Sequence, residues 1–239
     1  MSNSHIVSSF DEDIKELRAK IVEMANFVEK QFSYAEEALL NQDLDLAKKI
    51  REQDKIVDDM EQNIEKKAIE LIAIRSPMAD DLREIISAIK ISTALERIGD
   101  YAKNLSKRVT VLHESKNLEA NYSVISQMIS MINIMNKDVV DAYVNRNAEK
   151  AIAVWSRDMV VDNLYDGLFR QMLTYMMENP KSITPATHLL FVAKNVERAG
   201  DHITNIAELI YYIIEGTQLE MVRPKGDLSS EANVEFNAD

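Results

Sequence analysis

The chain has 239 residues, a formal net charge of −12 at pH 7 and no cysteine. Its length suffices for a sizeable hydrophobic core, and the absence of cysteine excludes disulfides, thiolate metal sites and cysteine nucleophiles. The negative charge disfavours nucleic acid and anionic membranes as partners, because both repel an acidic surface. With five Gly, four Pro and 46% hydrophobic residues, the composition is typical of an all-helical protein.

We expect neither a targeting segment nor a membrane span. The N-terminus lacks a basic start followed by an apolar run, so we expect no signal peptide. The strongly apolar run near the end, residues 209–214, is far too short to span a bilayer. We therefore expect a cytoplasmic protein without membrane insertion.

Apolar residues recur three and four positions apart through most of the chain, which predicts helices. Asp43 and Asn147 follow matched turns and are expected to cap the second and fifth helices, since their side chains can accept from free backbone amides. Pro77 and Pro180 mark the ends of the second and fifth helices, because the residue before a proline is pushed out of helical conformation. The predicted helices cover residues 6–40, 44–75, 79–113, 120–144, 147–177 and 184–215.

The two halves of the chain repeat each other. Early in each half they align at an offset of 104, and the segment LERIGDYAKNLSKR at 95–108 matches VERAGDHITNIAEL at 196–209 at an offset of 101. The simplest architecture is all-α, with two tandem three-helix antiparallel bundles. Helices of about 30 residues would each be about 45 Å long, so the molecule should be elongated. We assign residues 1–115 to the first bundle, 116–216 to the second and 217–239 to a flexible acidic tail.

Acidic residues recur four positions apart at matched places in both halves. The pairs are Asp54 with Asp58, Glu96 with Asp100, Asp158 with Asp162, and Glu197 with Asp201. A helical wheel places the pairs of the third and sixth helices on the polar face, away from the deepest core. If the faces of neighbouring helices adjoin, four carboxylates converge in each half and need a cation. Oxygen ligands suit hard ions such as Mg²⁺, Ca²⁺, Mn²⁺ or Fe³⁺.

A solvated helix face is the alternative interpretation, since a single acid pair at this spacing is common. Repetition of Glu-Arg-x-Gly-Asp-x-x-x-Asn beside a repeated Asp-x-x-x-Asp favours a functional site. Arg97 and Arg198 could bind an anion or form ordinary surface ion pairs. Gly99 and Gly200 each cost roughly 1 kcal/mol inside a helix. They could admit a close neighbouring helix or a metal cluster.

Together, the duplicated three-helix plan, the two Glu-Arg-x-Gly-Asp-x-x-x-Asn motifs and the acid pairs on the preceding helices resemble the PhoU family. The resemblance covers roughly residues 10–215. It implies an accessory protein of the phosphate-specific transport system that restrains the phosphate-starvation response when phosphate is plentiful. The implied partners are the ATPase subunit of the phosphate ABC transporter, a membrane sensor histidine kinase and a second copy of the chain.

The same resemblance implies multinuclear metal clusters, with Fe, Zn, Mn, Mg and Ca as the candidate ions. One site would use Asp54, Asp58, Glu96 and Asp100, and the other Asp158, Asp162, Glu197 and Asp201. The residues that match as flanking positions are Arg97, Asn104, Arg198 and Asn205. No catalytic residue is expected.

Three functions remain open from the sequence. A non-enzymatic regulator is the expected one. A metal-dependent hydrolase or redox enzyme is the second, because clustered carboxylates can hold ions that activate water, although no general base or nucleophile arrangement is evident. The third is a metal-free helical adaptor whose acidic faces bind basic partner surfaces.

Overall fold

A computed structural model describes residues 2–113 and 119–220 of the chain, and in that part it contains helices and turns without strands. The helices are α1 (Ser2–Asn41), α2 (Leu44–Arg75), α3 (Ala79–Leu112), α4 (Glu119–Asn145), α5 (Ala148–Glu178) and α6 (Ile183–Glu215), with a 3₁₀ turn at Pro180–Ser182. The predicted all-helical fold is therefore confirmed. Most of the expected tail, from residue 221 onward, lies outside the described residues. Nowhere in 2–113 or 119–220 does a helix combine the length and apolarity needed to span a bilayer.

Matched turns begin the second helix of each half. The Asp43 carboxylate accepts from the amides of the second and third residues of α2, at 3.0 and 2.9 Å. The Asn147 side chain accepts from the amide of the third residue of α5 at 2.9 Å. The residues just before these caps, Gln42 and Arg146, both have positive φ angles, of 53° and 49°. Both predicted caps are confirmed, and the repeat extends to the backbone conformation of the turns.

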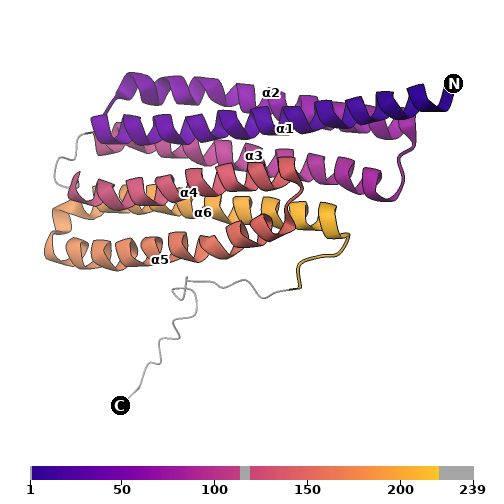
Figure 1. Ribbon diagram of the computed structural model, residues 1–239. Coiled ribbons are helices and arrows are strands. Elements are labelled where there is room, and N and C mark those ends of the chain that lie inside the picture. The colour runs from indigo at the N-terminus through magenta and orange to yellow at the C-terminus, as the bar shows by residue number, and fades with distance from the viewer. Residues whose placement is uncertain (1, 114–118, 221–239) are drawn as a thin grey trace, which may run out of the picture.

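The two bundles lie side by side, with all helices running along one long axis (Figure 1). Helix α3 of the first bundle packs against α6 of the second, and α1 packs against α4. The α3–α6 pair is antiparallel: Arg83 near the start of α3 lies over the Tyr212 ring near the end of α6, whereas Arg108 near the end of α3 contacts His188 near the start of α6. Helices α2 and α5 lie on opposite outer sides.

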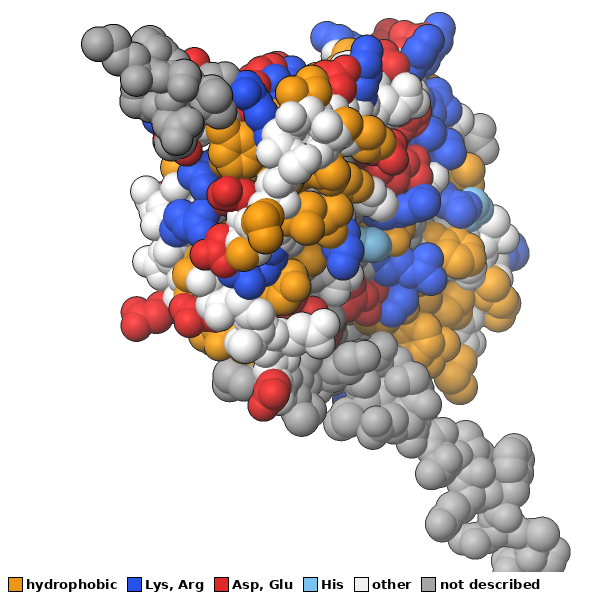
Figure 2. Space-filling model, turned by 90° about the vertical axis from the view of Figure 1, so that its right-hand side faces the viewer, with side chains coloured by type: hydrophobic (Ala, Val, Ile, Leu, Met, Phe, Trp, Pro, Cys, Tyr) orange, Lys and Arg blue, Asp and Glu red, His pale blue; other side chains and the backbone are white. Residues whose placement is uncertain are grey.

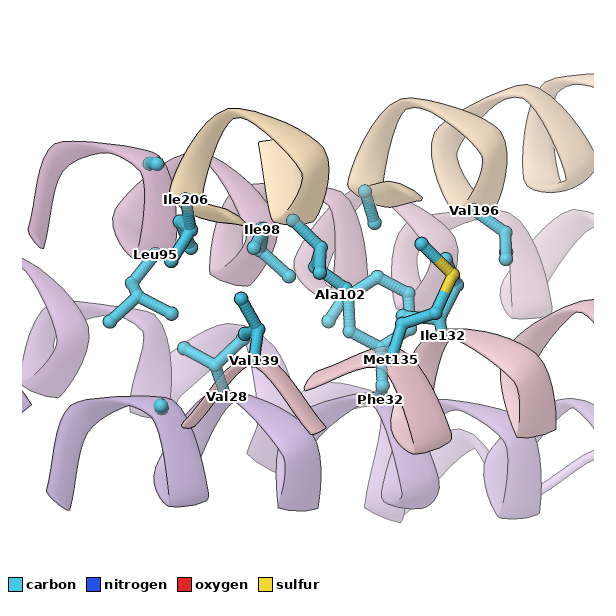
Figure 3. Packing of buried hydrophobic residues seen from close by; sticks show 14 of the residues in the cluster. Val28, Phe32, Leu95, Ile98, Ala102, Ile132, Met135, Val139, Val196 and Ile206 are labelled. Atoms are coloured by element: carbon cyan, nitrogen blue, oxygen red, sulfur yellow. The ribbon is translucent and has the colours of Figure 1, made fainter. Parts of the chain in front are cut away.

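One hydrophobic core runs through both repeats. Figure 3 shows where its centre lies, with side chains from α1 (Val28, Phe32), α3 (Leu95, Ile98, Ala102), α4 (Ile132, Met135, Val139) and α6 (Val196, Ile206) packed together. The buried apolar surface is therefore shared by the two halves. The boundary between 1–115 and 116–216 lies outside the described residues and stays a prediction from the repeat. Helix α3 packs against α1, α2 and α6, and helix α6 packs against α3, α4 and α5, so each of them has neighbours from both repeats.

The surface is more mixed than the net charge suggests. Figure 2 views the end of the molecule where α2 turns into α3, and side chains of both charges alternate there with hydrophobic ones. Ile74 and Met78 at this turn are 74% and 79% exposed. This end of the molecule can therefore make apolar contacts as well as contacts with groups of either charge.

A buried carboxylate ties the two repeats together near this end. Glu84 of α3 accepts from Arg18 of α1 and, at 2.8 Å, from Arg146 in the turn that follows α4. Burial alone would raise the pKa of Glu84, but the two guanidinium groups hold it below its ordinary value, so the carboxylate stays charged. Glu84 itself is 5% exposed, whereas the side chains of Arg18 and Arg146 are 28% and 42% exposed, so the carboxylate is the buried member of this group and depends on its two partners.

Replacing Glu84 with Gln should lower the free energy of unfolding by about 1–2 kcal/mol, because the charge-assisted hydrogen bonds to two guanidinium groups weaken while water still reaches both of those groups. Glu70→Gln, at an exposed position of α2, is the control and should change it by less than about 0.5 kcal/mol. Urea unfolding of both variants measures the difference. Equal stability of the two variants would contradict the assigned role.

Candidate functional site

The first acidic face, defined as Asp54 and Asp58 of α2 with Glu96 and Asp100 of α3, is brought together by the packing of α2 on α3. Lys103 lies between its two helices. The ammonium of Lys103 donates to the carboxylate of Asp54 and, at 3.3 Å, to Oδ1 of Asp100. These hydrogen bonds raise the pKa of Lys103, with the bond to Asp54 contributing most. The predicted approach of the α2 and α3 acid pairs therefore occurs, with a lysine between them.

Crowding of like charges changes the proton affinity of this face. Burial raises the pKa of Asp58, and the charges of Asp54 and Asp100 raise it further. Burial raises the pKa of Glu96 to about 7, with Asp100 as the next largest cause and Glu61 contributing as well. The first acidic face therefore takes up a proton near neutral pH, which is how a carboxylate cluster without a strong external cation lowers its repulsion.

The Glu96 pKa gives a stability prediction with a defined sign. The folded pKa of about 7 lies above the ordinary value of 4.5, so the folded chain binds the proton more tightly and loses stability as pH rises from 4.5 to 7. In EDTA, Glu96→Gln, which resembles the protonated side chain, should melt at a higher temperature than the parent at pH 8 and at nearly the same temperature at pH 5. Circular dichroism melts at both pH values test this.

Glu65→Gln, at an exposed position of α2, is the matched control for Glu96→Gln and should show no such divergence between the two pH values. An equal difference between Glu96→Gln and the parent at pH 5 and pH 8 would rule out the raised pKa.

The second acidic face, defined as Asp158 and Asp162 of α5 with Glu197 and Asp201 of α6, is more deeply buried. Asp158, Asp162 and Glu197 are only 1%, 4% and 5% exposed. Lys194 donates to Oε1 of Glu197 at 2.8 Å, whereas Oε2 of Glu197 makes no hydrogen bond with the part of the chain that the structure describes. Burial raises the pKa of Glu197; Lys194 opposes the increase, and Asp201 and Asp162 add to it.

The motif glycines allow these approaches. A Cβ added at Gly200 would lie 2.3 Å from Oδ1 of Asp158, so the α5 carboxylate rests directly on the backbone of α6. A Cβ at Gly99 would lie 3.2 Å from Cγ1 of Val57 and 3.3 Å from Oε1 of Gln31. Of the two explanations for these glycines, close helix packing applies at Gly99, whereas Gly200 accommodates a carboxylate of the candidate site.

Alanine substitutions at Gly167 and Gly200 should distinguish the close contact at Gly200 from the gain in helix propensity that alanine brings at any helical glycine. Gly167→Ala in α5 meets nothing within 4 Å and should raise the free energy of unfolding by about 0.5–1 kcal/mol. Gly200→Ala should lower it by about 1 kcal/mol or more, because the buried Asp158 carboxylate must move. Chemical denaturation of both variants is the measurement. A similar gain in both would contradict the close contact at Gly200.

The predicted flanking residues have separate surroundings. Arg97 is exposed and lies 3.5 Å from Glu96 and 3.8 Å from Asp100, which are loose ion pairs. The Asn104 amide oxygen accepts from Lys107 at 3.1 Å, so that oxygen is engaged away from the carboxylates. Arg198 and Asn205 are both exposed. The ion-pair interpretation of Arg97 fits this geometry.

A cleft of about 580 Å³ follows the seam between α3 and α6, beside the two motifs. Arg97 and Asn205 contribute to its lining. Nearby, equivalent positions of the two motifs meet: the Tyr101 hydroxyl and Nε2 of His202 lie 3.3 Å apart. His202 therefore belongs to the contact between the repeats.

Sequence reasoning missed part of the charge arrangement. The wheel placed the acids of the third and sixth helices away from the deepest core, and Glu96, Asp100 and Asp201 are indeed only partly buried, but Glu197 is 5% exposed. No burial was predicted for the acids of the preceding helices, of which Asp54, Asp158 and Asp162 are buried because the acid-bearing helices cover each other. Glu61, one turn beyond Asp58, influences Glu96. Asp166 is 6% exposed and continues the four-residue spacing of Asp158 and Asp162, a signal that was present in the sequence.

The donor chemistry of both faces suits a hard cation, since each offers four carboxylates from two helices. The space beside Gly200 is filled by Oδ1 of Asp158, so this glycine positions one of the candidate ligands and leaves no room for a further group there. The side chains do not, however, form a finished coordination shell. Across residues 2–113 and 119–220, no three His, Cys, Asp or Glu side chains converge closely enough to share one ion. Metal binding would therefore require side-chain rotation and displacement of a lysine.

A duplicated helical bundle with an acidic face in each repeat is the class of protein defined by the fold and this geometry. A family model described as the PhoU domain matches residues 21–109 and 125–210. The chain belongs to the PhoU family, and the resemblance inferred from its motifs is confirmed.

Proteins of similar length that carry the family's name match this chain over nearly all of its residues. The phosphate-specific transport system accessory protein PhoU homolog of Rhizobium meliloti strain 1021 is 47% identical over 230 residues, which cover 96% of this chain and 97% of that protein. A protein of the same name from Caulobacter vibrioides strain NA1000 / CB15N is 44% identical over 227 residues, covering 95% and 99%.

Solved structures match the fold as well. The crystal structure of PhoU from Pseudomonas aeruginosa has a TM-score of 0.83 at 36% identity, covering 87% of this chain and 100% of that one. The phosphate transport system regulatory protein PhoU from Streptococcus pneumoniae also has a TM-score of 0.83, at 28% identity, with coverage of 89% and 100%.

Proposed function

We propose that the protein is an accessory regulator of the phosphate-specific transport system. It limits phosphate uptake and restrains the phosphate-starvation response when phosphate is plentiful. The single observation that carries this proposal is the similarity over nearly the full chain to relatives named as accessory proteins of that system. Both halves of the chain match the family model, and each half carries its set of four acids.

The proposed mode of action is that of a cytoplasmic adaptor. The chain would contact the ATPase subunit of the phosphate ABC transporter and a sensor histidine kinase, and would pair with a second copy of itself. The mixed surface at the α2–α3 end, with exposed Ile74 and Met78, supports protein–protein contact as the mode of action. The family names of the relatives and the absence of a recognisable nucleophile arrangement support a role without catalysis.

Metal binding is the second part of the proposal. The second acidic face would hold a hard cation through Asp158, Asp162, Glu197 and Asp201, and the first would use Asp54, Asp58, Glu96 and Asp100. Such an ion would neutralise the carboxylates and join two helices of one bundle. Oε2 of Glu197, which is buried and has no hydrogen-bond partner among the residues that the structure describes, supports this role.

One observation favours an alternative. In the chain without metal, burial raises the pKa of Glu96 to about 7, so if the other carboxylates of the first acidic face held a cation that activates water, Glu96 could exchange protons at neutral pH as a general acid or base. A metal-dependent hydrolase therefore remains the second candidate function. Phosphatase turnover by the purified chain with Mn²⁺, abolished by Glu96→Gln, would favour it over the regulator.

Deleting the gene and restoring variants tests the regulator. Deletion should raise expression of a phosphate-starvation reporter in high phosphate, and the parent chain should restore repression. We expect the double variant Asp100→Asn/Asp201→Asn to fail to restore it and to contain less metal by mass spectrometry. Unchanged reporter expression and phosphate uptake after deletion would overturn the regulatory proposal.

The control for this experiment is Glu70→Gln/Glu149→Gln, which makes the same charge change at exposed positions and should behave as the parent. Restored repression by the Asp100→Asn/Asp201→Asn variant, with unchanged metal content, would remove the acidic faces from the mechanism. The regulatory role would then stand without them.

A further inference from the structure

We propose that Lys103 is the resident counter-ion of the first acidic face. Its ammonium holds α2 against α3 when no metal is present, and a metal ion binds this face by displacing it. The competition with metal rests on the metal binding proposed above, whereas the clamping of the two helices does not.

The contacts of Lys103 are those expected of a bound cation. The side chain starts from α3, one turn after Asp100, and its ammonium reaches both Asp100 on its own helix and Asp54 on α2. Asp54 is 7% exposed, and the Lys103 side chain is 28% exposed. Removing one partner of an ion pair that is partly shielded from water leaves the other charge without a counter-ion, which destabilises more than breaking an exposed pair within one helix.

The duplication shows that this lysine is a separate feature of the first half. The residue equivalent to Lys103 in the second motif is Thr204, which is fully buried and donates its hydroxyl to the Asp201 carbonyl at 2.7 Å. Conversely, Lys194 of the second half stands where the first half has Thr93. The four acids were kept at equivalent positions in both repeats, while the lysine beside them was placed differently.

A local ammonium and a divalent cation compete for the same carboxylate oxygens. Binding of a metal to Asp54 and Asp100 requires that the Lys103 ammonium leave, since two cations at contact distance repel each other strongly. The length and flexibility of the lysine stem allow the ammonium to withdraw toward solvent. Lys103 thus sets how readily the first acidic face accepts a metal ion, and its ammonium offsets part of the negative charge of that face before an ion arrives.

The test compares Lys103→Met, which keeps much of the stem and removes the charge, with the full-length parent. In EDTA, Lys103→Met should melt at a lower temperature than the parent. Titration with Mn²⁺, followed by electron paramagnetic resonance of the free ion, should show binding at the first face that is about tenfold tighter or more, as expected after removal of one adjacent unit charge. Mn²⁺ should also raise the melting temperature of the variant by more than that of the parent.

Two further variants serve as controls. Lys107→Met, one turn along α3 and bonded to Asn104, should match the parent in both measurements. Lys103→Arg keeps the charge, so it should retain the parent's melting temperature in EDTA and its weak Mn²⁺ binding at this face. This variant also tests the proposal if Lys103→Met fails to fold.

The outcomes separate this inference from the proposed function. If Lys103→Met melts like the parent in EDTA and binds Mn²⁺ no more tightly, the inference is overturned, even where Asp201→Asn still lowers Mn²⁺ binding. If neither the parent nor Lys103→Met binds Mn²⁺, both the competition and the proposed metal binding are overturned. A lower melting temperature in EDTA would then leave the helix clamp alone supported.

Discussion

Packing α2 against α3, and α5 against α6, brings the carboxylates of neighbouring helices into one partly buried space. Like charges at such distances repel, and burial removes the water that would screen them. In the first face, the Lys103 ammonium offsets part of this repulsion, and the pKa of Glu96 is raised, so that this carboxyl is more easily protonated. In the second face, Lys194 and the backbone contact at Gly200 accommodate a still more buried set. The same electrostatic constraint therefore applies where α2 packs against α3 and where α5 packs against α6.

Helices α3 and α6 carry the motif acids and also form the join between the repeats. Their apolar faces enter the shared core, shown around Ile98 and Val196 in Figure 3, while their acids face α2 and α5. Tyr101 and His202 meet where the two motifs come together. A change in one acidic face therefore acts on a helix that packs against both repeats. A helix in this position could connect the state of an acidic face to the contact between the repeats, as the proposed regulatory role requires.

The two repeats are alike in backbone and different in charge environment. Their turns share a cap and a positive φ angle, and their acids occupy matched positions. Asp54, however, contacts a lysine that has no equivalent in the second half, and Asp158 lies against a glycine backbone. Similar folding information and unequal site chemistry can thus coexist after duplication, because the core depends on apolar periodicity and the site on a few polar positions.

The sequence by itself determined the six helices, their caps, the duplication and the family. Each of these depends on local spacing or on residue identity, such as Asp43 before α2 or the acid at position 100. Only the tertiary structure decided that the bundles lie side by side on one core, that the acids are covered by neighbouring helices, and that Lys103 bridges Asp54 and Asp100. Burial and the proton affinity of Glu96 depend on which helix faces which, and helical periodicity on one element carries no information about its partner.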